Sequence, residues 1–66
     1  MIIKDLEGNL RHVKYIKKIF GFEKDVLSGQ SIKKPFVEVM IIGSHNEWKM
    51  FYPLDKFMEI NPNIKI

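Results

Sequence analysis

Residues 36–52 carry two runs of β-branched and aromatic residues, separated by a short polar break and bounded by Pro35 and Pro53. Such residues suit the pleated, half-buried surface of a β-strand. Gly43 and the polar residues that follow it are typical of a turn. The segment therefore predicts a β-hairpin, and pairing Gly43 with Asn46 fixes its register.

This register divides the side chains of the hairpin between two faces, because successive side chains of a strand point to opposite sides. One face is almost purely apolar and is expected to be the core; it carries Val37, Val39, Ile41, Trp48, Met50 and Tyr52. The other face mixes charged residues with the apolar residues Phe36, Met40, Ile42 and Phe51. Two interpretations of this second face stay open. Either another segment of the chain covers it, or it is an exposed patch that binds a partner.

The length of the chain and its lack of Cys limit how the fold can be stabilised. The 66 residues are expected to form a single domain, 1–66, with a modest core. Without Cys, neither a disulfide nor a thiolate metal site can reinforce that core, so a closed sheet or homodimerisation is expected instead. No apolar run is long enough to cross a membrane and no signal peptide is evident, which predicts a cytoplasmic protein.

Residues 10–20 admit two structures. As a helix, they would place Val13, Ile16 and Ile19 on one side and basic residues on the other. As a strand, they would require a bulge or a two-sided strand to accommodate Ile16 and Phe20. The β-branched residues, the lack of an acid in the first turn and the turn signal at residues 8–9 favour the strand.

The remaining segments give weaker patterns. Residues 21–34 are mostly polar and predict a long surface loop, with or without an irregular strand. Leu54, Phe57 and Met58 are spaced for one helical turn near residues 54–58, which Pro53 can begin. Residues 63–66 predict either a tail or a short edge strand.

The order of these elements resembles that of the SH3-like small barrels. The resemblance is architectural and implies a mostly β fold of about five strands with one short helical turn near residues 54–58. It implies no functional residues, because no specific motif supports it. The alternative is an α+β fold, in which a helix at residues 10–20 packs on a three-stranded sheet.

The chain lacks the residue patterns of known catalytic sites. It has no Cys nucleophile, no Gly-x-Ser-x-Gly elbow and no phosphate-binding glycine loop. His12 and His45 are isolated and without partners for a metal site. We therefore expect a protein that is not an enzyme and that uses no cofactor or metal.

The preferred function is a binding module that acts on another protein as an inhibitor or adaptor. Phe36, Met40, Ile42 and Phe51 are the candidate contact residues, since Met and Phe at a partly polar rim suit protein interfaces. Short intracellular proteins of phages and mobile elements often bind and modulate host proteins. Size and composition suggest the same role here by analogy.

The alternative function is nucleic-acid binding by a small barrel. The net charge is +3, and the basic residues are concentrated in the first half of the chain. The candidate contact residues are Arg11, Lys14, Lys17, Lys18, Lys33 and Lys34. Tyr15 or Phe36 would then stack on bases. Lysine clusters are also the usual solvated face of a sheet, so the pattern by itself does not decide between these roles.

Overall fold

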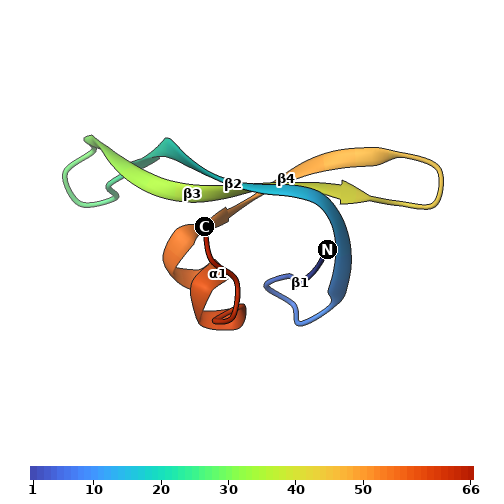
Figure 1. The fold of residues 1–66 in the computed structure, drawn as a ribbon. Coiled ribbons are helices and arrows are strands. Elements are labelled where there is room, and N and C mark those ends of the chain that lie inside the picture. Colours follow the sequence, from blue (N-terminus) through green and yellow to red (C-terminus); the bar gives the residue numbers. More distant parts are fainter.

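In the computed structural model, which describes all 66 residues, four antiparallel strands form a curled half-barrel and one short helix follows them (Figure 1). The elements are β1 (Ile2–Lys4), β2 (Leu10–Lys24), β3 (Ser31–Ile42), β4 (Glu47–Pro53) and α1 (Leu54–Ile60). The predicted mostly β fold is confirmed, with four strands in place of about five. Residues 63–66 form no strand, and the predicted helical turn extends to Ile60.

The hairpin formed by β3 and β4 has the predicted register. Ile41 lies opposite Trp48, Val39 opposite Met50, and Val37 opposite Tyr52. The N–H of Gly43 donates a 2.7 Å hydrogen bond to the carbonyl of Asn46 and closes the turn. The alternation of apolar and polar residues sets this register, because a slip by one residue would turn the apolar face to solvent.

Residues 10–20 belong to strand β2, so the alternative α+β fold with a helix there is wrong. The pairing of β2 with β3 shifts register between Val13 and Ile16. This β-bulge brings Val13 and Ile16 to the same side of the sheet, and it explains a spacing that resembles a helix in the sequence. Pairing with β3 satisfies the backbone hydrogen bonds of β2, and the strand conformation suits its β-branched residues. These two effects outweigh the helical spacing of the apolar residues.

The predicted long loop at residues 21–34 is also wrong, because β2 continues to Lys24 and β3 begins at Ser31. Only residues 25–30 lie outside the strands. The carboxylate of Asp25 accepts hydrogen bonds of 3.0 Å from the N–H of Leu27 and from the hydroxyl of Ser28. Gly29 adopts a φ of +72°, which favours glycine. These contacts close a second hairpin, which projects from the domain (Figure 1).

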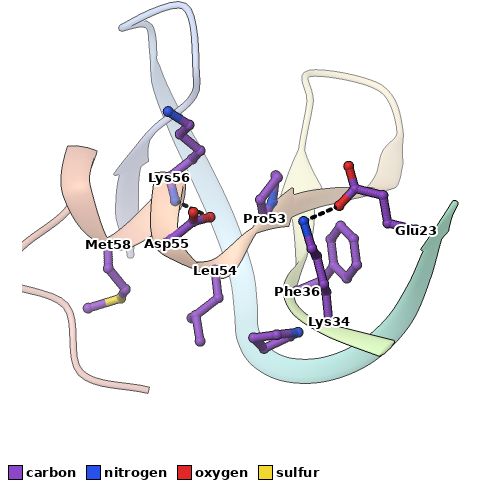
Figure 2. A pocket seen from close by; sticks show the side chains of 9 residues that line it. Glu23, Lys34, Phe36, Pro53, Leu54, Asp55, Lys56 and Met58 are labelled. Atoms are coloured by element: carbon purple, nitrogen blue, oxygen red, sulfur yellow. Dashed lines mark hydrogen bonds and ion pairs between the residues drawn. The ribbon is translucent and has the colours of Figure 1, made fainter. Parts of the chain in front are cut away.

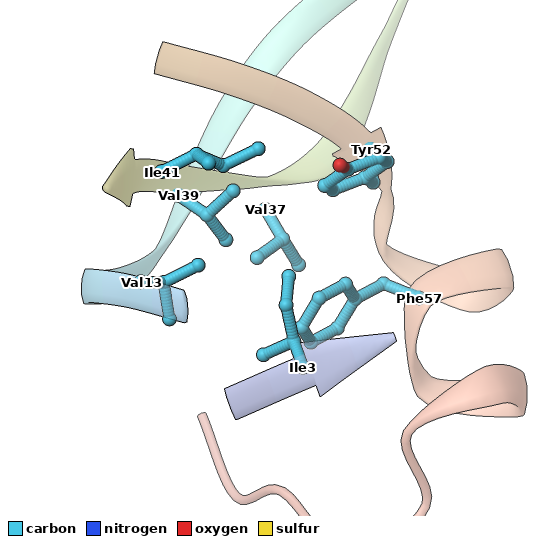
Figure 3. Close-up of a cluster of buried hydrophobic side chains, with 7 residues drawn as sticks. All are labelled: Ile3, Val13, Val37, Val39, Ile41, Tyr52 and Phe57. Carbon is cyan, nitrogen blue, oxygen red and sulfur yellow. The ribbon is translucent and has the colours of Figure 1, made fainter. Parts of the chain in front are cut away.

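The hydrophobic core lies on one side of the sheet, where β1 and α1 cover it (Figures 1 and 3). It consists of Ile3, Val13, Val37, Val39, Ile41, Tyr52 and Phe57. Phe57 of α1 is fully buried and stacks on Tyr52, with ring centroids 6.0 Å apart. The predicted core face is only partly buried, because Trp48 and Met50 are 37% and 38% exposed. Their partners on β3, Ile41 and Val39, are buried, so the exposure of these two side chains follows from the position of β4 at the edge of the sheet.

Asn61 connects the two ends of the chain through its side-chain amide. Its Oδ1 accepts a 2.8 Å hydrogen bond from the N–H of Lys4, and its Nδ2 donates a 2.9 Å bond to the carbonyl of Lys4. The same Nδ2 donates to the carbonyl of Phe57 at 3.2 Å. Asn61 therefore holds the end of α1 against β1 by hydrogen bonds of the kind that a neighbouring strand would make.

Candidate binding surface

The outer face of the sheet, which we define as the side opposite β1 and α1, is not covered by any element (Figure 1). Alternation from the paired residues places on it Phe36, Glu38, Met40 and Ile42 of β3, Glu47, Lys49 and Phe51 of β4, and Lys17 and Ile19 of β2. The four predicted protein-binding residues therefore share this face. The sequence left open whether another segment of the chain covers this face, and in the structure none does.

These four residues form a patch that is partly accessible to solvent. Ile42 and Phe51 are 44% and 52% exposed, whereas Phe36 and Met40 are half-buried. Across the strands, Phe51 lies opposite Glu38 and Ile42 opposite Glu47. The patch is therefore apolar side chains interleaved with charged ones, as in the rim and core of many protein interfaces.

Glu38 lies at the centre of the outer face and is buried. The hydroxyl of Tyr15 donates a 2.6 Å hydrogen bond to its carboxylate, and Lys17 Nζ lies 3.4 Å from the same oxygen. The hydrogen bond from Tyr15 lowers the pKa of Glu38, with a further contribution from Lys17, and the same bond raises the pKa of Tyr15. Glu38 is thus an ionised carboxylate whose Oε2 is held by Tyr15 and Lys17.

The sequence did not indicate the pair formed by Tyr15 and Glu38. Tyr15 reaches Glu38 because the bulge in β2 displaces it relative to β3. A regular alternation in β2 would assign Tyr15 to the side that carries Val13. The β-branched spacing around Ile16 was the only available signal of the bulge.

Three ion pairs neutralise most of the charge on the outer face. Lys14 lies 3.7 Å from Glu47, Lys17 lies 3.4 Å from Glu38, and Lys34 lies 2.6 Å from Glu23. Each lysine of the three has an acidic neighbour. The outer face therefore lacks the strong positive potential that attracts a polyanion.

The structure does not bring the six predicted nucleic-acid-binding residues together. Arg11 pairs with Asp5 beside β1, with Nε 3.0 Å from the carboxylate. Lys14, Lys17 and Lys34 lie on the outer face in the three ion pairs described above. Lys18 and Lys33 lie on the opposite side of the sheet, where their ammonium groups are 5.5 and 4.9 Å from the centre of the Phe20 ring.

A groove of about 670 Å³ lies next to the patch, where α1 begins (Figure 2). Phe36 and Lys34 of β3 line one part of it, and Leu54 and Met58 of α1 line another. The groove adjoins a part of β3 that β4 does not reach, because β4 pairs only with residues 36–42. Pro35 has no N–H in this part of β3, so a strand of a partner would pair poorly with it. The groove therefore extends the patch and does not form a separate site.

Comparisons with protein-family models, with curated proteins and with solved structures found no match for this chain. No three His, Asp or Glu side chains come together in a way that could hold a metal ion. The single helix, α1, is too short to cross a membrane.

Proposed function

We propose that this chain is a small, non-enzymatic binding module that docks on a protein partner through its outer face. The observation that carries the proposal is the uncovered patch of Phe36, Met40, Ile42 and Phe51 on a sheet whose core lies entirely on the other side. Burying exposed apolar area of this kind favours association by about 25 cal/mol per Å² before the costs of binding are counted.

The charge distribution favours a protein as the partner of the outer face. Three of its four lysines are paired with glutamates, and Lys49 is the exception. The face therefore presents apolar groups beside largely neutralised polar ones. A nucleic acid would have to compete with Glu23, Glu38 and Glu47 for these lysines. A protein surface of similar composition would not, because rim charges can be matched one by one.

We further propose that the architecture is a half-open version of the SH3-like barrels. The antiparallel strands in sequence order and the helix that directly follows β4 support this proposal. The partner of such a module would be a protein in the same cell. By analogy with other proteins of this size and composition, the chain would come from a phage or mobile element and modulate a protein of the host.

The test is a comparison of the proteins captured from nuclease-treated native lysate by the wild-type chain and by the double variant Ile42→Lys/Phe51→Lys. Both positions face a glutamate across the strands, Glu47 and Glu38, so lysines there are tolerated by the fold. We expect the variant to keep the far-UV circular dichroism of the wild type and to lose at least one captured protein.

The matched control is Val26→Lys/Leu27→Lys, in the loop between β2 and β3. These two side chains are 96% and 98% exposed, so the control adds the same charge and removes the same number of exposed apolar side chains. It should capture the same proteins as the wild type. Capture that is equal for all three chains would contradict docking through the outer face.

A further inference from the structure

The hairpin of β2 and β3 carries a second exposed surface on the side of the sheet opposite the outer face. Register and alternation place on it Lys18, Phe20, Phe22 and Lys24 of β2, and Lys33 of β3. We call this set the arm surface. The cover formed by β1 and α1 does not extend over its aromatic side chains, since Phe20 and Phe22 are 57% and 73% exposed.

The arm surface is positively charged and has no acidic neighbour on its own strands. The only acidic residues of β2 and β3 are Glu23 and Glu38, and both point to the outer face. None of Lys18, Lys24 and Lys33 forms an ion pair, whereas three of the four lysines of the outer face do. The surface is therefore complementary to a polyanion.

The two phenylalanines are placed to accept bases. They occupy positions i and i+2 of one strand, roughly 6.8 Å apart along it, and point to the same side. The ammonium groups of Lys18 and Lys33 lie over the Phe20 ring, 5.5 and 4.9 Å from its centre. A base that stacks on this ring would displace them towards its own phosphates. Aromatic residues on a sheet, flanked by basic side chains, bind successive bases by stacking while the lysines contact the phosphates.

We propose that the arm surface binds single-stranded nucleic acid. This site lies on the opposite side of the sheet from the outer face. Its residues also differ from the six basic residues that the sequence predicts as nucleic-acid contacts. Of those six residues only Lys18 and Lys33 belong to it, and Phe20, Phe22 and Lys24 complete it. A duplex fits poorly, because its bases are not available to the phenylalanine rings.

The test is fluorescence anisotropy with a labelled thymidine oligonucleotide and with a duplex of the same length, in a series of salt concentrations. We expect binding to the single strand with a slope of log affinity against log salt of about −2, as three phosphate contacts give. We expect Phe20→Leu and Phe22→Leu each to weaken it roughly 10-fold to 100-fold through the loss of one stacked base. Equal affinity for the duplex would overturn the proposal.

Two further experiments distinguish base stacking from attraction by net charge and from binding to a membrane. Lys18→Ser/Lys24→Ser/Lys33→Ser should abolish the salt dependence, whereas Lys14→Ser/Lys34→Ser/Lys49→Ser, with the same net charge, should leave it unchanged. Equal losses in the two triple variants would show attraction by net charge alone and overturn the proposed site.

The second experiment measures binding to vesicles of anionic phospholipid. Binding to vesicles that survives the Leu substitutions, with no binding to the oligonucleotide, would identify a membrane-binding surface and overturn the proposal.

Discussion

The hydroxyl of Tyr15 donates a 2.6 Å hydrogen bond to the carboxylate of Glu38, across the bulged pairing of β2 with β3. The bond lowers the pKa of Glu38 from 4.5 and raises the pKa of Tyr15 from 10.0. By linkage, the stability that Glu38 contributes is present above pH 4.5 and is lost as the pH falls through its lowered pKa. The contribution of Tyr15 is present below pH 10.0 and is lost as the pH rises through its raised pKa.

Tyr15→Phe should therefore lower the free energy of unfolding at neutral pH and flatten its dependence on pH at both ends. Urea titrations at a series of pH values measure this. Part of the acid dependence should remain, because Asp5 and Asp25 also have lowered pKa values. Tyr52→Phe is the control for the acid end, because Tyr52 makes no bond to Glu38. At the alkaline end it should also flatten the profile, since burial raises the pKa of Tyr52. A Tyr15→Phe profile parallel to that of the wild type would contradict the coupling.

Asn61→Ala should cost about 1–3 kcal/mol of stability, because it leaves the N–H and the carbonyl of Lys4 without their partners. Chemical denaturation measures the loss. Hydrogen exchange locates it, with faster exchange expected at the Lys4 amide. Asn63→Ala, at an exposed position two residues further on, is the control and should change neither quantity. Unchanged protection of Lys4 in Asn61→Ala would show that the amide bonds do not hold the chain ends together.

Phe57→Ala should cost about 3–5 kcal/mol, since it opens a cavity beneath Tyr52 at a fully buried position. A loss of this size is comparable to the whole stability of many small domains, so we expect a largely unfolded chain by circular dichroism. Phe51→Ala removes the same side chain from a half-exposed position on the outer face and should leave the chain folded. Similar losses in the two variants would mean that α1 does not complete the core.

Gly43→Ala should cost about 1–2 kcal/mol by overpacking. The added Cβ would lie 2.7 Å from Cζ3 of Trp48 and 3.0 Å from the carbonyl oxygen of Asn46. Because Trp48 is the only Trp, a shift in its emission maximum reports the displacement. Gly8→Ala strains a residue with a φ of +85° but meets no atom within 4 Å, so it should destabilise the chain without changing the emission. An unchanged spectrum in Gly43→Ala would contradict the packing of Trp48 on the turn.

The sequence predicts the fold where a strand alternates between buried apolar residues and exposed polar ones. The register of the β3–β4 hairpin was predictable because it puts the apolar residues of both strands on one face and Gly43 beside Asn46 at the turn. The extent of the core was not predictable, because the exposure of Trp48 and Met50 depends on the position of β4 at the edge of the sheet, which the order of the strands sets. The hairpin at residues 21–34 was missed because both of its sides are exposed, so its sequence lacks the alternation that marks a half-buried strand.

The candidate surface shows the same division. Alternation from the hairpin register was sufficient to group Phe36, Met40, Ile42 and Phe51. The grouping of the basic residues was not predictable, because it depends on the bulge in β2 and on cross-strand partners. These features pair Lys17 with Glu38 but leave Lys18, the next residue, on the opposite side beside Phe20.

The order of the strands has a consequence for folding during synthesis. Each strand pairs with the next one along the chain, so the sheet grows through short-range contacts that cost little loop-closure entropy. The contacts that complete the core come from the other end, since Asn61 binds Lys4, 57 positions away, and Phe57 packs with Ile3. A nascent chain that has formed all four strands therefore still exposes the side of the sheet that becomes the core, until Phe57 and Asn61 have left the ribosome.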